Sequence, residues 1–109
     1  MYVASKPGIN FVATITKEFT VKNAKGWHAR PCALIARTIA QYPGVSVTFS
    51  CPARSASASG TSLFEMMVLA VNCGDRVIAT LTGKDNKKIN ELLFVLEKIM
   101  DRQFYDGDF

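Results

Sequence analysis

The hexapeptide GWHARP, residues 26–31, contains the side chains of this sequence that are best suited to chemistry. It holds the only histidine, His28, and an arginine, Arg30, two positions later. Pro31 lacks an amide hydrogen and is tolerated only in the first turn of a helix, so we expect a helix to begin near Ala29 with His28 at its cap. An imidazole at that position lies at the positive end of the helix, where unpaired backbone amides attract anions.

The chemistry that fits this arrangement is transient phosphorylation of the histidine. The helix dipole disfavours the imidazolium cation and therefore favours the neutral, nucleophilic ring. The backbone amides of Ala29 and Arg30 and the Arg30 guanidinium would receive a phosphoryl group on a ring nitrogen. Gly26 would allow the turn, and Trp27 would shield the site or dock a partner. The alternative is a capping histidine that contacts only solvent, and these residues alone leave both interpretations open.

Composition limits the class of protein. A chain of 109 residues suffices for one compact domain, which we expect to span 1–109 with a core at about 15–100 and short extensions at both ends. No segment approaches the roughly 18 apolar residues of a membrane span, and the first residues lack the pattern of a secretory signal. The net charge of +4 favours acidic partners without identifying them.

The cysteines give a further indication of compartment. Cys32, Cys51 and Cys73 are odd in number and widely spaced, which favours a reducing cytoplasm over a disulfide framework or a zinc site. Cys32 falls in the first turn of the predicted helix, where a thiol could be activated. Its helical phase predicts packing against the core instead.

The spacing of apolar residues predicts an alternation of strands and helices that would position the hexapeptide. Apolar side chains at every second position indicate strands, and apolar side chains at helical spacing indicate amphipathic helices. Strands are expected at 15–22, 45–49, 55–59 and 77–81, and helices at 29–42, 63–71 and 89–100. With the order β-α-β-β-α-β-α, three helices should cover one face of a four-stranded, mainly antiparallel sheet. The expected fold class is α+β, an open-faced β-sandwich, with 55–59 at an edge.

The hexapeptide resembles the active-site stretch of HPr, the histidine-containing phosphocarrier protein of the bacterial phosphoenolpyruvate:sugar phosphotransferase system. In that family Gly, an apolar residue, His, Ala, Arg and Pro occur in this order. The segment TSLFEMMVLAVNCGDRV, residues 61–77, resembles the family's second-helix region. The predicted order of elements also matches the family's open-faced sandwich, and the resemblance extends from about Thr16 to Met100.

The resemblance implies a phosphocarrier rather than an enzyme. His28 would accept the phosphoryl group through Nδ1 from phosphorylated enzyme I and pass it to enzyme IIA domains of sugar permeases, with Arg30 assisting. No cofactor and no metal are implied, because transfer between histidine nitrogens depends on positioning and charge neutralisation. We expect a cytoplasmic monomer with no membrane partner. We expect no nucleic-acid partner either, since the basic residues are scattered and no binding motif is present.

Ser62 would correspond to the family's regulatory serine, the target of HPr kinase/phosphorylase. Ser62 and Glu65 also have the spacing of a capping box, in which the hydroxyl accepts from an early amide and the carboxylate reaches back. The family commonly has glycine where this chain has Glu65, and that carboxylate would repel a phosphate on Ser62. The alternative function is a mainly regulatory protein that acts through phosphorylated Ser62 on a transcriptional or enzymatic partner.

A partner-binding surface is expected beside His28 if the starts of the first and second helices lie together. An apolar patch ringed by cations would suit an acidic partner and speed the encounter. Its expected members are Trp27, Leu63, Phe64, Met67 and Arg37, with Lys25 or Lys22 near its edge. The alternative for Leu63 and Met67 is ordinary core packing.

Overall fold

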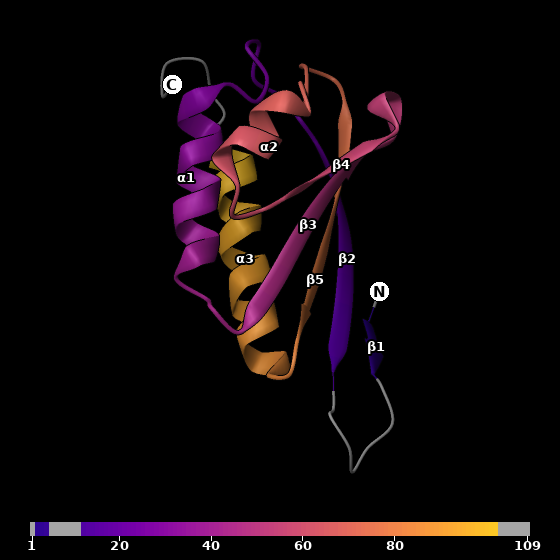
Figure 1. Ribbon diagram of the computed structural model, residues 1–109, viewed down its shortest axis with the longest axis vertical. Coiled ribbons are helices and arrows are strands. Elements are labelled where there is room, and N and C mark those ends of the chain that lie inside the picture. Colours follow the sequence, from indigo (N-terminus) through magenta and orange to yellow (C-terminus); the bar gives the residue numbers. More distant parts are fainter. Residues whose placement is uncertain (1, 5–11, 103–109) are drawn as a thin grey trace.

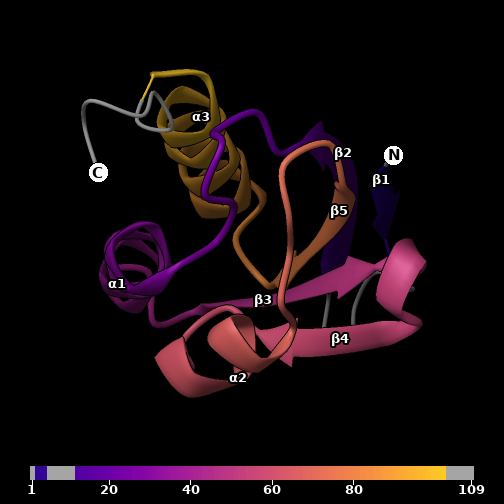
Figure 2. The same ribbon diagram turned by 90° about the horizontal axis from the view of Figure 1, so that it is seen from above.

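Residues 2–4 and 12–102, the part that this computed structural model describes, form a five-stranded antiparallel sheet with three α-helices on one face (Figures 1 and 2). The strands lie in the order β1-β2-β5-β3-β4. Their bounds are β1 Tyr2–Ala4, β2 Ala13–Thr20, β3 Val45–Cys51, β4 Ala56–Ser59 and β5 Arg76–Gly83. The helices are α1 Ala29–Ala40, α2 Leu63–Val68 and α3 Asn86–Arg102, and a short 3-10 helix, η1 Pro52–Arg54, joins β3 to β4.

The α+β fold class and the order β-α-β-β-α-β-α are confirmed. The four predicted strands pair antiparallel, and the weakly patterned β4 lies at a sheet edge as expected. β1 is an addition: it pairs with β2 from Tyr2–Ile15 to Ala4–Ala13, within the extension to which no element was assigned. Three residues are too few for a period of two to be recognised.

The second helix is shorter than predicted. It ends at Val68 rather than Val71, because Ala70 adopts a left-handed backbone conformation with φ 56° that breaks the helical repeat. A side chain with a Cβ atom in this conformation costs about 1 kcal/mol. Glycine is the usual residue there, so an apolar stretch containing alanine gave no sign of the break.

The core lies between the sheet and the helices. Alternate residues of β3 and β5 face the helices, which is why Phe49, Ala79 and Leu81 are fully buried. The α1 and α3 helices contribute the facing apolar stripes. Their most buried members are Cys32, Ile35, Ile39, Ile89, Leu92 and Leu96. Full burial of each large aliphatic side chain contributes roughly 1.5–3 kcal/mol, so this layer holds α1 firmly against the sheet.

Within the described part of the chain, no helix combines the length and the apolar composition that a membrane crossing requires.

Candidate functional site

His28 is the N-cap residue of α1. Its backbone is extended, with φ −92° and ψ −169°, and its carbonyl accepts the Cys32 amide at 3.2 Å, the first bond of the helix. Its own amide donates to the Gly26 carbonyl at 3.1 Å. The ring is half-buried, and its Nε2 atom is buried. The predicted helix start at Ala29 is therefore confirmed, and His28 lies at the position expected for it.

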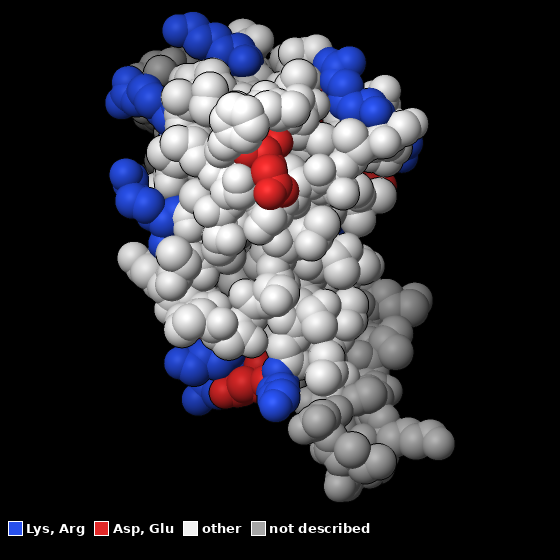
Figure 3. All heavy atoms as spheres, viewed as in Figure 1, with Lys and Arg blue, Asp and Glu red and all other residues white. Residues whose placement is uncertain are grey.

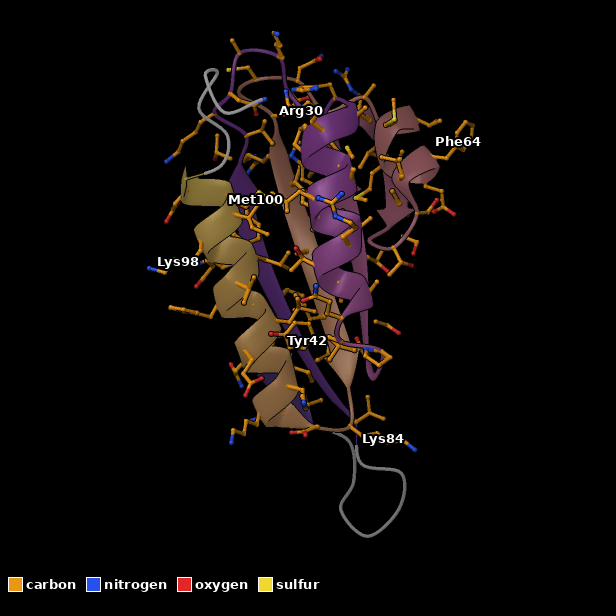
Figure 4. All side chains as sticks on the ribbon, turned by 90° about the vertical axis from the view of Figure 1, so that its left-hand side faces the viewer. Arg30, Tyr42, Phe64, Lys84, Lys98 and Met100 are labelled. Carbon is orange, nitrogen blue, oxygen red and sulfur yellow. The ribbon has the colours of Figure 1, made fainter. Side chains whose placement is uncertain are left out.

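Among the described residues, no side chain is seen to cap the N-terminus of α1. The His28 side chain makes no capping hydrogen bond, and the first turn of the helix contains no acidic residue. The amides of Ala29 and Arg30 have no acceptor within the helix, and Pro31 has no amide hydrogen to donate. Ala29 and Arg30 are both exposed, and Figure 4 shows Arg30 at this end of α1. The arrangement can receive an anion with two backbone donors and one guanidinium.

A tight turn carries the chain into His28. The Gly26 amide donates to the Asn23 carbonyl at 3.1 Å, and the Asn23 side-chain Nδ2 donates to the Gly26 carbonyl at 2.6 Å. Asn23 is only 3% exposed, so its amide group acts inside the fold. The sequence predicted a turn here but not the role of Asn23. An Asn three residues before a Gly is the available signal, because Asn side chains commonly bond to the backbone of turns.

The segment after α2, rather than the start of α2, lies against this turn. The Trp27 amide donates to the Val71 carbonyl at 3.0 Å. Gly26 has φ +66°, and a Cβ atom there would lie 2.3 Å from the Val71 oxygen. The expectation that the two helix starts lie together is therefore wrong. The N-terminus of α1 and the C-terminal end of α2 occupy the same end of the molecule (Figure 1).

Trp27 belongs to the core and not to the partner surface predicted for it. It is 3% exposed, and its ring meets Phe49 edge to face, with the ring centroids 5.1 Å apart. A large aromatic ring gains more from burial than from exposure, and the neighbouring turn directs it inward.

The exposed surface of α2 is mainly apolar. Leu63, Phe64 and Met67 are 39%, 76% and 43% exposed, and Val68, which the sequence analysis did not include, is 64% exposed. We call these four residues the α2 patch. Core packing, the alternative for Leu63 and Met67, is excluded by this exposure. Figure 3 shows acidic atoms surrounded by uncharged surface on the face that α2 presents, with basic side chains farther out, and Glu65 of α2 is itself exposed.

The cations expected around the site are exposed but lie at different distances from it. Lys22 and Lys25 are exposed in the segment that leads to His28. Arg37 is exposed in the last turn of α1, nine residues after His28, which corresponds to about 13 Å along the helix axis. Arg37 therefore flanks the side of α1 rather than the histidine.

Ser62 is the N-cap of α2. Its hydroxyl oxygen accepts the Glu65 amide at 3.1 Å, as the capping-box spacing predicts. The Glu65 carboxylate does not return to the Ser62 amide as expected but accepts the Ser59 amide at 2.8 Å. The Ser62 amide donates instead to the Ser59 carbonyl at 3.1 Å. The Ser62 hydroxyl and the Glu65 carboxylate thus each accept a hydrogen bond from a backbone amide of the protein.

Cys32 packs in the first turn of α1 as its helical phase predicts. It is fully buried, and burial raises the pKa of its thiol to about 11. The thiol therefore stays protonated near neutral pH, although it lies close to a helix N-terminus, where a thiolate would be favoured.

Residues 15–99 match the family described as the PTS HPr component phosphorylation site. The chain belongs to the PTS HPr family. Curated relatives include the multiphosphoryl transfer protein of Salmonella typhimurium and that of Escherichia coli O157:H7. Each is 32% identical over 71 residues, which cover 65% of this chain and 19% of the relative. The chain thus spans 19% of the length of these relatives.

Solved HPr structures share the fold. The phosphocarrier protein HPr from Bacillus anthracis superimposes with a TM-score of 0.67 at 20% identity, covering 80% of this chain and 96% of that one. HPr-C-His from Thermoanaerobacter tengcongensis gives 0.68 at 21% identity, covering 83% and 94%. The family match indicates a phosphocarrier component of the phosphotransferase system, and the likeness to the solved structures shows the shared fold.

Proposed function

We propose that this protein accepts a phosphoryl group on Nδ1 of His28 from phosphorylated enzyme I and passes it to enzyme IIA domains of sugar permeases. The observation that carries the proposal is the position of His28 as the N-cap of α1, with Arg30 in the first turn of the helix and no acidic residue in that turn. Family membership supports the choice of phosphotransferase-system partners, and the local geometry supports His28 as the acceptor.

The burial of one ring nitrogen supports the choice of atom. Nε2 of His28 is buried, which disfavours reaction through that atom and favours Nδ1. In the transfer, the Nδ1 lone pair forms a bond to phosphorus while the bond between phosphorus and the donor's histidine nitrogen breaks. The phosphoryl oxygens then meet the amides of Ala29 and Arg30, and the Arg30 guanidinium neutralises their charge. These groups need little reorganisation, because the backbone of α1 already holds the amides.

The α2 patch and the nearby cations support the class of partner. An exposed apolar surface of this kind commonly marks a protein interface, and flanking cations favour an acidic partner. We propose that enzyme I and IIA domains dock on this face with the histidine at its edge. Trp27 is not part of this face, because its side chain is buried.

Regulation through Ser62 is the second candidate function. Ser62 lies next to Leu63 and Phe64, so a phosphate added there by an HPr kinase/phosphorylase would place negative charge beside the α2 patch. It would also lie in the same helical turn as the Glu65 carboxylate, which opposes the gain from the helix start.

Transfer of labelled phosphate tests the carrier role. The protein is incubated with radiolabelled phosphoenolpyruvate and a phosphotransferase-system enzyme I, and His28→Ala is compared with the wild type. Ser62→Ala serves as the control that removes the other candidate acceptor. We expect an acid-labile label on the wild type and on Ser62→Ala and none on His28→Ala. An unlabelled wild type, or a label that persists in His28→Ala, would contradict the proposal.

The second half of the relay is tested with the same material. After removal of enzyme I, an added IIA domain should take the label from the carrier. NMR of the ¹⁵N-labelled imidazole ring then distinguishes a phosphoryl group on Nδ1 from one on Nε2. A phosphoryl group on Nε2 would show that the buried nitrogen becomes accessible and would overturn the assignment of the atom.

A further inference from the structure

Arg54, at the tip of the β3–β4 hairpin, contacts the turn that follows α2. Its Nε donates to the Ala70 carbonyl at 3.1 Å, and its Nη2 lies 3.5 Å from the Asp75 Oδ2. Ala70 is the residue whose φ of 56° ends α2. The hairpin tip and this turn lie at the end of the molecule that also holds the start of α1 (Figure 1). Arg54, which belongs to the β3–β4 hairpin, thus bonds to a neighbouring turn that contains a strained backbone conformation.

The same turn, residues 70–75, holds the loop that carries His28 at both of its ends. At the beginning of the loop, the Val21 amide donates to the Asp75 carbonyl at 2.9 Å, and the Val21 carbonyl accepts the Gly74 amide at 2.7 Å. At the end of the loop, the Trp27 amide donates to the Val71 carbonyl at 3.0 Å. The residue after Trp27 is the phosphoryl acceptor of the proposed function.

Asp75 links the contact with Arg54 to the beginning of the loop that carries His28. Its Oδ2 faces the Arg54 guanidinium and also accepts the Asn72 amide at 2.9 Å, while its backbone carbonyl bonds to Val21. Loss of Arg54 would therefore leave both the left-handed residue and the carboxylate at the centre of the turn less constrained. Any relaxation would reach Trp27 through the Val71 carbonyl.

We propose that Arg54 is a positioning residue for phosphoryl transfer, acting through the Ala70 turn on the backbone that places His28. The proposal rests on the proposed function for its kinetic consequence. Arg54 touches neither the ring nor the phosphoryl group in this scheme. Misplacement of a reacting group by about 1 Å can slow a reaction about 100-fold, so a small relaxation of the loop suffices for a measurable effect.

A double-mutant cycle with Ala70 separates positioning from other roles. Glycine adopts a positive φ without strain, so Ala70→Gly should keep the turn in place when the Arg54 contact is lost. We expect Arg54→Ala to lower the maximal rate of transfer from phosphorylated enzyme I about tenfold, with the apparent KM for the carrier within about twofold. Arg54→Ala combined with Ala70→Gly should recover most of this rate. The control is Arg76→Ala, which removes a neighbouring arginine that pairs with Glu18 at 3.7 Å and should stay within about twofold of wild type.

Hydrogen exchange of the Trp27 amide provides a readout that does not depend on phosphoryl transfer. We expect about tenfold faster exchange in Arg54→Ala and recovery in the double variant, with core amides of β5 as the reference for global stability. If the wild type takes no phosphate, the proposed function fails, and the exchange pattern still decides the Arg54 role. Unchanged Trp27 exchange in Arg54→Ala, a raised KM with unchanged maximal rate, or no rescue by Ala70→Gly would overturn the proposal.

Discussion

The N-termini of α1 and α2 both contain backbone amides without acceptors in the helix, but only the start of α2 is capped by a side chain. Ser62 fills the start of α2 with its own oxygen, and Glu65 adds a carboxylate to the first turn. The start of α1 has an imidazole at the cap position, no side-chain cap and no acidic residue in its first turn. A filled helix start is stable and has little left to offer an anion, whereas an open one costs stability and can bind. This difference supports the proposal that the start of α1 receives a phosphoryl group.

Filling the start of α1 should have the largest effect. Asp is among the best N-cap residues, so His28→Asp should abolish labelling completely while raising the free energy of unfolding by about 1 kcal/mol relative to His28→Ala. The loss follows from removal of the nucleophile, and the gain follows from capping. Labelling assays and urea denaturation measure the two effects. An Asp variant no more stable than the Ala variant would show that the open end is not a source of instability.

Disturbing the close contact between Gly26 and the segment after α2 should have the next largest effect, a loss of stability. Gly26→Ala combines a positive φ with a Cβ atom 2.3 Å from the Val71 oxygen, so we expect a loss of about 2–4 kcal/mol of stability. Gly74→Ala is the matched control. Gly74 has φ +92° but no atom within 4 Å of the added Cβ, so its loss should be only about 1 kcal/mol. Similar denaturation midpoints for the two variants would argue against the close approach at Val71.

Opening the start of α2 should have a smaller effect. Ser62→Ala removes the acceptor of the Glu65 amide, and loss of such a cap costs about 1 kcal/mol. Labelling of His28 should remain within about twofold of wild type, because α2 meets the His28 loop at its other end. Ser57→Ala, at an exposed position of β4, should change stability by less than about 0.5 kcal/mol. A strong loss of labelling in Ser62→Ala would mean that the two helix starts are coupled.

Adding an anion to the α2 start should give the smallest effect. Phosphorylation of Ser62 should stabilise Glu65→Gln more than the wild type, by about 0.3–1 kcal/mol, since glutamine removes the repelling charge. Glutamine can still accept the Ser59 amide through its side-chain oxygen, so the contact made by Glu65 is kept. Thermal unfolding of both phosphorylated proteins measures the difference. Equal stabilisation would show that the Glu65 carboxylate does not affect the phosphate.

The sequence was informative where one residue type has one local consequence. Pro31 located the start of α1 and, through it, His28, and the apolar periods located the sheet and the core. It was uninformative where the result depends on a close approach in space. The packing of Trp27 against Phe49 and the bonds of Arg54 to the turn after α2 join segments whose proximity no local pattern reveals. The end of α2 could not be predicted from the sequence because Ala70 has a positive φ, which alanine rarely adopts.

The short strand β1 has a consequence for self-association. β1 covers β2 at Ala13, Thr14 and Ile15, whose side chains carry no charge, and the register ends there. Lys17 and Glu18, both exposed, occupy the remainder of that edge. Charged side chains discourage one sheet edge from pairing with another, and an edge strand as short as β1 offers few backbone groups for such pairing. A protein trimmed of Tyr2–Ala4 would keep its fold-determining core but present an uncharged stretch of β2 to its neighbours, and its solubility at high concentration would fall.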